Sequence, residues 1–324
     1  MEARLVERAN IPFKTIPAAG IHGVGLKRLP GNLIRLSRGF FAARRILREF
    51  KPDVFFFTGG YVAVPMALAG MRVPTLLYVP DVEPGLALKT LARFAEKIAV
   101  TAQNSYQYFN HQERLVLTGY PTRTDLKRWT RSDAQRTLNL ISDVPVLLVS
   151  GGSKGAHSIN AAVLANLSAL LEQVQVIHIT GELDWTIVEA RAKELTGVKA
   201  SRYHIFSYLH EEMGAALAAA DFALSRAGAS TLGEYPLFGL PAILVPYPYA
   251  WRYQKVNADV LVQRGAAVML EDDKLSDQLL PTVRNLLSQP QKLASMRQAM
   301  QNFSRPQAAA EIGRHILALC EERS

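Results

Sequence analysis

The stretch VPVLLVS, residues 144–150, runs directly into GGSKGAHSIN, residues 151–160. Its apolar residues do not alternate with polar ones, which is typical of a parallel strand buried on both faces. The glycines permit a tight turn and a close approach of the backbone to an anion, and the start of the following helix offers unpaired N–H groups. The loop matches neither GxxxxGK[ST] nor GxGxxG. We therefore predict a nucleotide-diphosphate site at Gly151–Gly155, with a tight turn that binds nothing as the alternative.

The second half of the chain repeats this order of strand and helix. Further apolar runs of strand length lie at residues 174–180, 203–206, 221–226, 241–247 and 266–271. Segments of helical period separate them, for example residues 159–173, 210–220 and 257–265. Strands and helices that alternate in this way form a parallel sheet with helices on both faces. This half is predicted to be a complete doubly wound α/β unit.

The first half shows the same order with fewer elements. We expect strands at residues 53–60, 75–80, 97–102 and 114–119, and helices at 31–50, 64–70 and 86–97. Residues 122–144 are polar and charged, and they form the natural linker to the second half. The opening MEARLVERAN has a helical pattern without a strand before it, whereas a doubly wound domain normally opens with a strand. The first domain is therefore expected to be atypical or to lack its beginning.

Length and composition bound the class of protein. With 49% hydrophobic and 20% charged residues, a chain of 324 residues is expected to form two globular domains. The single cysteine, Cys320, cannot form an internal disulfide, and the seven histidines show neither HxxxH nor HExxH spacing. No uncharged apolar run reaches the length of about 20 residues that spans a bilayer, so a soluble, cytoplasmic protein is expected. The net charge of +9 favours anionic partners, namely nucleic acid, acidic lipid or phosphorylated ligands.

A second glycine-containing junction follows the strand expected at residues 221–226. The small residues Gly228 to Ser230 again expose the start of a helix, and Ser230 and Thr231 can cap that helix or donate to a phosphate. Glu234 lies three positions after Thr231 on the same helix face, where a carboxylate suits two ribose hydroxyls. A structural glutamate of a capping box is the alternative.

The segment PYPYAWRYQKVNAD, residues 246–259, follows another predicted strand. Its polar side chains Arg252, Gln254, Lys255 and Asn257 stand among aromatic rings. Such a mixture suits sugar hydroxyls and also RNA bases, although taken alone it is more typical of a solvated loop. Residues 58–61, Thr-Gly-Gly-Tyr, also follow a predicted strand, in the first half of the chain, and we expect them to form the wall of a cleft.

Five arginines lie on the helix expected at residues 31–50, among apolar residues such as Phe40 and Phe41. They are Arg35, Arg38, Arg44, Arg45 and Arg48. Such a helix can lie on an anionic bilayer. A domain helix with an arginine-rich solvent face is the more common explanation, and the sequence alone favours it. No nucleic-acid-binding module is recognisable, so no nucleic-acid partner is expected.

Four segments, SGGSKGAHSIN, LSRAGASTLGE, GLPAILVPYPYAWRYQKVNA and TGGYVAVPMALA, together resemble one enzyme family. This is the MurG family of UDP-N-acetylglucosamine:lipid I N-acetylglucosaminyltransferases, within glycosyltransferase family 28. The resemblance extends from the first residue to about Asp273 and implies the GT-B fold of two Rossmann-like, doubly wound domains. It implies an incomplete acceptor- and membrane-side domain at residues 1–130 and a nucleotide-sugar domain at 143–304. A helix at about 305–324 is expected to pack back on the first domain.

The resemblance also implies roles for single residues. The diphosphate would face Gly152, Ser153 and Gly155, and further phosphate contacts would come from Arg226, Gly228, Ala229, Ser230 and Thr231. Glu234 would bind the ribose, Gln254 the sugar hydroxyls, and the stretch Leu209–His210 the uracil through its backbone. Arg123 would lie near the nucleotide.

Three departures from the family pattern bear on catalysis. The family opens with a GGTGGH loop whose histidine is a candidate base, whereas this chain begins with a later stretch and is therefore interpreted as N-terminally truncated. The family's HEQN is replaced by YVPD at residues 78–81, and Tyr253 and Tyr120 replace a glutamine and an asparagine. Asp81 and Glu83 are then the remaining candidates for the catalytic base.

The predicted function is inverting transfer of GlcNAc from UDP-GlcNAc to a polyprenyl-diphosphate-linked muramyl peptide, lipid I to lipid II. The expected partners are the UDP-sugar donor, a lipid-linked acceptor and an anionic surface on the cytoplasmic face of the cell membrane, with no cofactor or metal. A related glycolipid hexosyltransferase, a UDP-GlcNAc epimerase on the same fold, and a UDP-sugar-binding remnant without turnover are the alternatives.

Overall fold

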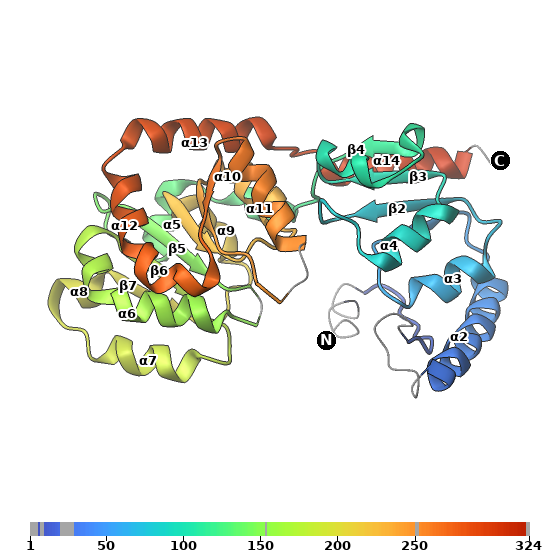
Figure 1. The fold of residues 1–324 in the computed structure, drawn as a ribbon, viewed down its shortest axis with the longest axis horizontal. Coiled ribbons are helices and arrows are strands. Elements are labelled where there is room, and N and C mark those ends of the chain that lie inside the picture. The colour runs from blue at the N-terminus through green and yellow to red at the C-terminus, as the bar shows by residue number, and fades with distance from the viewer. Residues whose placement is uncertain (1–5, 7–9, 20–28, 153, 250–252, 322–324) are drawn as a thin grey trace.

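The computed structural model describes residues 6, 10–19, 29–152, 154–249 and 253–321. These residues form two lobes, each built on a parallel β-sheet (Figure 1). The first lobe holds a sheet of four strands and the second a sheet of six. The predicted α/β fold with two parallel-sheet units is therefore confirmed. The helical pattern at residues 1–10 falls almost entirely outside the described residues.

The second lobe contains every strand predicted for the second half. They are β5 (Val146–Ser150), β6 (Gln175–Ile179), β7 (Tyr203–Phe206), β8 (Phe222–Ser225), β9 (Ala242–Leu244) and β10 (Ala267–Met269). The order in the sheet is β10-β9-β8-β5-β6-β7, so the sequential order of the parallel strands changes sense between β5 and β8, where Ser150 pairs with Ser225. Ligands bind at such reversal points, beyond the carboxyl ends of the strands.

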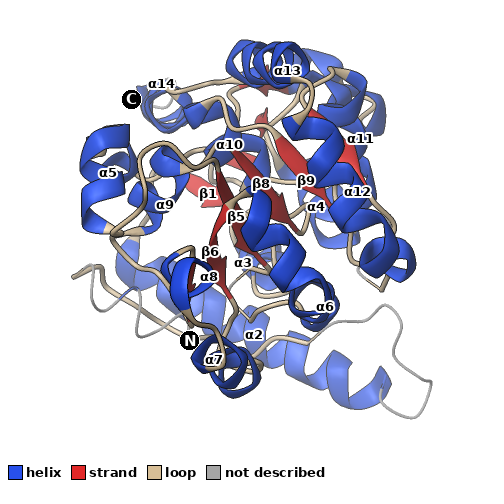
Figure 2. Ribbon diagram, turned by 90° about the vertical axis from the view of Figure 1, so that its left-hand side faces the viewer, coloured by secondary structure: helices blue, strands red, loops and turns tan. Residues whose placement is uncertain are grey.

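Helices cover both faces of this sheet (Figure 2). They are α5 (Arg131–Thr137), α6 (His157–Gln173), α7 (Trp185–Lys193), α8 (Gly197–Ser201), α9 (Met213–Ala219), α10 (Thr231–Phe238), α11 (Tyr253–Gln263), α12 (Leu275–Leu287) and α13 (Pro290–Phe303). The strand residues alternate between the two buried apolar clusters, with Leu148 in one and Val149 in the other. A strand buried on both faces explains the unbroken apolar runs of the sequence.

The first lobe contains the four strands predicted for the first half. They are β1 (Phe55–Phe57), β2 (Thr75–Val79), β3 (Lys97–Val100) and β4 (Leu115–Leu117), in the order β1-β2-β3-β4. Among these described strands the order does not reverse, in contrast to the second sheet. One face is covered by α3 (Ala63–Ala69) and α4 (Leu86–Leu91), and α2 (Leu29–Phe50) packs against α3. The helix predicted at 86–97 ends early, because a 3₁₀ turn at Ala92–Phe94 leads into β3.

The last helix returns to the first lobe. α14 (Ala308–Glu321) follows α13 and lies against β2, where Ile312 and Leu319 join Leu76 and Tyr78 in an apolar cluster (Figure 1). The sheet of the first lobe is thus covered on its second face by a segment about 200 positions away in the chain.

The segment predicted as a linker is folded onto the second lobe. A 3₁₀ helix at Thr124–Arg128 and α5 both contact α9, and Leu126, Ala134 and Leu138 are buried in the core of the second lobe. Short 3₁₀ helices also lie at Gln103–Tyr108, Gln112–Arg114 and Asp272–Lys274. Within the described residues, no helix combines the length and apolarity needed to cross a bilayer.

Candidate functional site

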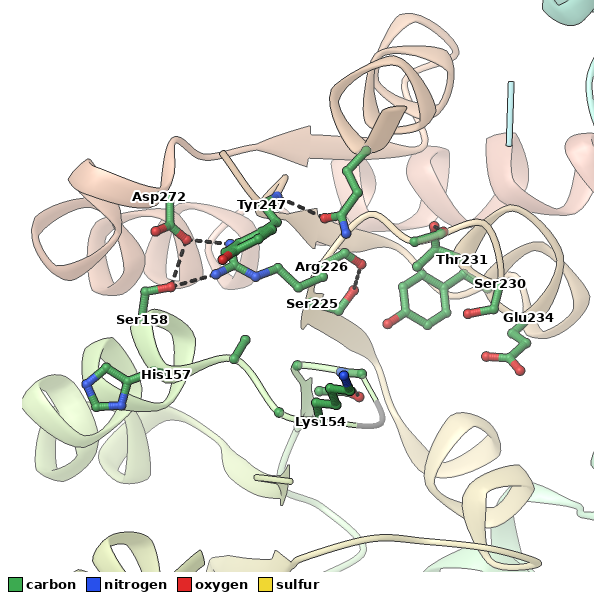
Figure 3. A pocket seen from close by; sticks show the side chains of 18 of the residues that line it. Lys154, His157, Ser158, Ser225, Arg226, Ser230, Thr231, Glu234, Tyr247 and Asp272 are labelled. Atoms are coloured by element: carbon green, nitrogen blue, oxygen red, sulfur yellow. Dashed lines mark hydrogen bonds and ion pairs between the residues drawn. The ribbon is translucent and has the colours of Figure 1, made fainter. Parts of the chain in front are cut away.

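A cavity of about 830 Å³ lies at the carboxyl ends of β5, β8, β9 and β10 (Figure 3). Its walls come from the loop before α6, the loop before α10, the start of α11 and the segment after β10, with Met213 of α9 at one side. The two glycine-containing junctions predicted from the sequence therefore lie on opposite walls of one cavity.

The first wall is the loop Gly151–Gly155 between β5 and α6. Gly152 and Gly155 have positive φ angles of 86° and 80°, and the Gly155 amide donates to the Gly152 carbonyl at 2.9 Å. A Cβ atom on Gly155 would lie 2.2 Å from the Thr180 carbonyl oxygen, so only glycine fits there. The loop delivers the N-terminus of α6, with its unpaired amides, to the cavity. Ser153 lies outside the described residues.

The opposite wall is the turn Gly228–Thr231 at the start of α10. The Thr231 hydroxyl donates to the Gly228 carbonyl at 2.6 Å, so Thr231 is buried and braces this turn. Ser230 and Glu234 face the cavity from the same helix start (Figure 3). A Cβ atom on Gly228 would meet no atom within 4 Å, which leaves open space for a ligand to approach the backbone.

Glu234 is largely shielded from water. Burial raises the pKa of the Glu234 carboxyl, and the nearby Arg123 guanidinium opposes that rise. Arg123 reaches this region from the loop after β4 and donates to the His210 carbonyl at 3.1 Å. Arg123 thus ties the first-lobe strand loop to the segment predicted to pair with uracil. Neither Arg123 nor His210 belongs to the described lining of the cavity, and Ala229 follows Gly228 in the turn without lining it either.

The inner end of the cavity is polar and charged. Arg226 donates from Nη2 to the Ser158 hydroxyl at 2.7 Å, and its Nη1 donates to the Asp272 carboxylate (Figure 3). Its guanidinium also lies 5.1 Å from the centre of the Tyr247 ring. The Arg226 charge, predicted as a phosphate contact, is therefore partly compensated by Asp272.

Gln254 lies in the first turn of α11 and lines the cavity. Its Oε1 accepts a hydrogen bond from the Tyr247 amide at 2.8 Å, so this side chain also orders the loop after β9. An amide that holds one loop and lines the cavity can present its NH₂ group to a ligand hydroxyl.

The two candidate bases lie away from the described lining of the cavity. Asp81 accepts a hydrogen bond from the Asn257 amide at 2.8 Å; burial raises the pKa of the Asp81 carboxyl, and that bond opposes the rise. Glu83 is 3% exposed, with the Lys89 ammonium 3.8 Å from its carboxylate. Both follow β2 in the first lobe.

Several lining residues escaped the sequence prediction. Among them are His157, Ser158, Tyr247 and Asp272. His157 follows the first glycine loop directly, so its place in the sequence was the available signal. His157 is oriented by Asp184, which accepts from its ring Nδ1 at 3.0 Å. Among the described residues, no group of three or more His, Cys, Asp or Glu side chains has the arrangement to hold a metal ion.

Sequence comparison identifies the relatives of the chain. A protein of Roseiflexus sp. (strain RS-1) is 40% identical, over 96% of this chain and 80% of the relative. A protein of Desulfitobacterium hafniense (strain Y51) is 39% identical, over 96% of this chain and 86% of the relative. Both are named UDP-N-acetylglucosamine--N-acetylmuramyl-(pentapeptide) pyrophosphoryl-undecaprenol N-acetylglucosamine transferase.

Solved structures share the fold. The crystal structure of Acinetobacter baumannii MurG matches with a TM-score of 0.75 and 24% identity, over 98% of this chain and 88% of that one. The UDP-GlcNAc 2-epimerase of Neisseria meningitidis, bound to UDP-GlcNAc, matches with a TM-score of 0.67 and 12% identity, over 98% and 88% of the two chains. At these identities the likeness shows the GT-B architecture alone.

The two halves of the chain match two domains of a single enzyme family. Residues 1–100 match the N-terminal domain of glycosyltransferase family 28, and residues 146–312 match its C-terminal domain. With relatives at 40% identity along nearly its whole length, the chain belongs to glycosyltransferase family 28.

Proposed function

We propose that the chain is the UDP-GlcNAc-dependent hexosyltransferase that converts lipid I to lipid II in peptidoglycan synthesis. Family membership and the names of the relatives support this activity. The single structural observation that carries it is the pair of helix starts, those of α6 and α10, on opposite walls of one cavity. Backbone amides at two helix starts suit the two phosphates of a nucleotide sugar. The 2-epimerases share only the architecture, so they give no better support for the alternative.

The second lobe, built on β5 to β10, would hold the donor. We assign the diphosphate to the Gly152–Gly155 loop and to the turn Gly228–Thr231. The ribose hydroxyls are assigned to Glu234, because a carboxylate accepts from two neighbouring hydroxyls. The transferred sugar is assigned to the Gln254 amide. The first lobe, built on β1 to β4, would then carry the lipid-linked acceptor.

The reaction places most of its demand on positioning and charge. A hydroxyl of the acceptor attacks the anomeric carbon of GlcNAc; the new C–O bond forms as the bond to the β-phosphate breaks on the opposite face. The electron pair of the broken bond leaves with UDP, whose growing charge the amides at the two helix starts stabilise. The proton of the attacking hydroxyl goes to a base. Asp81 and Glu83 stay predictions for that base, and Asp81→Asn tests the first of them.

Two measurements test the proposed activity. Calorimetry of the purified chain with UDP is expected to show binding at micromolar to millimolar concentration, and transfer of labelled GlcNAc from UDP-GlcNAc to a lipid I analogue is expected to follow. UDP binding without transfer would instead indicate a donor-binding protein without turnover. Absence of UDP binding at millimolar concentration contradicts the proposal as a whole.

The exposed face of α2 supports a place for the acceptor lobe at an anionic membrane surface. Leu33, Ile34 and Phe41 are 51%, 54% and 68% exposed on this helix. The arginines at positions 35, 38, 44, 45 and 48 are all exposed as well. Apolar side chains ringed by arginines suit insertion at the level of lipid headgroups. The sequence favoured a solvated arginine face, whereas the exposure of these three apolar side chains favours the membrane.

Vesicle binding separates the two explanations. Phe41→Glu is expected to weaken sedimentation with phosphatidylglycerol vesicles by about tenfold, because it removes inserted apolar area and adds a repelled charge. Leu317→Glu on α14 is the matched control, since Leu317 is 62% exposed. Equal sedimentation of the two variants would indicate that α2 is an ordinary solvated helix.

A further inference from the structure

The Asn257 side chain joins the two lobes. It is completely buried, although it lies on α11 of the second lobe and reaches a loop of the first. Its Oδ1 accepts from the Val82 amide at 3.0 Å, and its Nδ2 donates to the Asp81 carboxylate at 2.8 Å. The same NH₂ group donates to the Ala227 carbonyl at 3.1 Å. Both donor hydrogens and the acceptor of this amide are therefore used.

The contact around Asn257 is apolar and closed. Val82 and Ala102 of the first lobe are fully buried in the same cluster as Ala258 and Leu261 of α11. At the rim of this contact, just after α11, the exposed Arg264 guanidinium donates to Oδ1 of the Asn104 side chain at 3.2 Å, again across the two lobes. Hydrogen bonds inside such a contact are strong, and a partner left unpaired there is costly.

Asn257 hydrogen-bonds to one segment beside the donor cavity and to another in the lobe assigned to the acceptor. Ala227 begins the turn whose next residues, Gly228–Thr231, form a wall of the donor cavity. Asp81 and Val82 follow β2 in the lobe assigned to the acceptor. Gln254, one turn earlier on α11, holds the other donor loop through the Tyr247 amide. One turn of one helix thus contacts both donor loops and the first lobe.

We propose that Asn257 is a positioning residue that fixes the donor turn at Ala227 against the first-lobe loop Asp81–Val82. The inference rests on the proposed function, because Asn257 would set the distance between the bound donor and the bound acceptor. Asp81 then serves as the hydrogen-bond acceptor of the Asn257 amide. An asparagine oxygen at the same place can still accept from this amide, although more weakly than the carboxylate does.

Steady-state kinetics of three variants test this assignment. Asn257→Leu and Asp81→Ala are expected to lower kcat/KM by about 10- to 100-fold, the range for a lost hydrogen bond to a charged group. Their Kd for UDP, measured by calorimetry, is expected to change by less than about threefold, because the turn is also braced by Thr231. Asp81→Asn keeps an oxygen acceptor for the Asn257 amide, so its kcat/KM is expected to fall less than that of Asp81→Ala.

Asn166→Leu is the matched control. Its amide donates to the Ala162 and Ser276 carbonyls at 2.9 Å each, within the second lobe and outside the cavity lining. Loss of an amide that only stabilises the fold lowers the melting temperature without a selective fall in kcat/KM. Asn257→Leu is expected to lower kcat/KM well below that of Asn166→Leu when both are measured at a temperature where both variants are folded.

Hydrogen exchange gives a readout that does not need turnover. Asn257→Leu is expected to speed amide exchange in residues 80–84 and 226–230 together, whereas Asn166→Leu leaves both at the rate of the unmutated chain. Unchanged exchange in both segments overturns the proposal, as does a kcat/KM for Asn257→Leu equal to that of the control. If Asp81→Asn loses as much activity as Asp81→Ala, the carboxylate itself is required and the positioning role of Asp81 is wrong. Failure of the unmutated chain to bind UDP contradicts the proposed function instead, and exchange still decides the role of Asn257.

Discussion

Arg226 and Asp272 form an ion pair in the wall of the donor cavity, with side chains that are 11% and 22% exposed. The Ser158 hydroxyl donates to the same Asp272 oxygen at 2.7 Å and accepts from Arg226 at 2.7 Å. Arg226 also donates to the Val245 carbonyl at 3.2 Å. The guanidinium is thereby fixed by the start of α6 and by the segments that follow β9 and β10, which lets it define the shape of the cavity.

Loss of Asp272 is expected to destabilise the fold. In Asp272→Ala the Arg226 charge stays largely buried without its partner, which costs about 1–3 kcal/mol of unfolding free energy. Urea unfolding followed by circular dichroism measures the change. Asp273→Ala is the control, because Asp273 is exposed and next in the chain; an equal change in both variants would show that the ion pair contributes nothing.

The fold was largely predictable because its strands are buried on both faces. Each strand that the structure describes coincides with a predominantly apolar run, for example Val146–Ser150 and Thr75–Val79. The segment 122–144 was mistaken for a linker because its buried residues Leu126, Ala134 and Leu138 are few and widely spaced. Their burial depends on packing against α9, which no local pattern reveals.

Those parts of the site could be predicted whose residues lie close together in the sequence. The glycine loops could be found because a strand, a glycine and a helix are adjacent in the chain. Ser158 and Asp272 meet although they are 114 positions apart, so their pairing needs the three-dimensional fold. Asp81 was predicted as a candidate base because YVPD at residues 78–81 replaces the family's HEQN, but its bond to Asn257 crosses 176 positions and has no sequence signal.

Glu234→Gln is expected to weaken UDP binding by about tenfold, because a neutral amide accepts more weakly from the ribose hydroxyls than a carboxylate does. Since burial raises the pKa of Glu234, the affinity of the unmutated chain is expected to fall as the pH is lowered through that pKa. Calorimetry at several pH values measures both effects. The affinity for 2′-deoxy-UDP should differ little between Glu234→Gln and the unmutated chain. If Glu234→Gln weakens the binding of UDP and of 2′-deoxy-UDP equally, a contact between Glu234 and the ribose 2′-hydroxyl is contradicted.

The same substitution is expected to stabilise the free protein at neutral pH. The folded carboxyl retains its proton above the ordinary pKa of 4.5, where the unfolded chain has already released it. The unfolding free energy therefore falls as the pH rises through this window, and an uncharged glutamine removes that fall. Thermal unfolding of both chains at pH 5 and pH 8 is the measurement; a variant that is less stable at pH 8 would contradict the shielding of Glu234.

Two glycines of the cavity are expected to respond in opposite ways to alanine. Gly155→Ala places a Cβ atom 2.2 Å from the Thr180 carbonyl oxygen at a φ of +80°, so a loss of more than about 2 kcal/mol in unfolding free energy is expected. Gly228→Ala meets no protein atom within 4 Å, so its stability should stay within about 0.5 kcal/mol of the unmutated chain. Its methyl group occupies the approach of the diphosphate, and calorimetry is expected to show weaker UDP binding. A Gly228→Ala variant with unchanged UDP affinity would place the diphosphate elsewhere.

His178 is expected to make the fold sensitive to acid. Burial lowers the pKa of this histidine to about 3, while its ring nitrogens bond to the Tyr203 hydroxyl at 2.8 Å and the Asn160 amide oxygen at 3.0 Å. Between pH 6.5 and about 3 the unfolded chain binds a proton that the folded chain refuses. The contribution of neutral His178 to the unfolding free energy is therefore fully present above pH 6.5. It falls below that pH, with a slope of up to about 1.4 kcal/mol per pH unit. Urea unfolding at pH 4.5 and pH 7 measures how much unfolding free energy is lost on acidification. This loss should be smaller for His178→Asn than for the control His111→Gln, which replaces an exposed histidine. An equal loss in the two variants would contradict the lowered pKa of His178 in the folded chain.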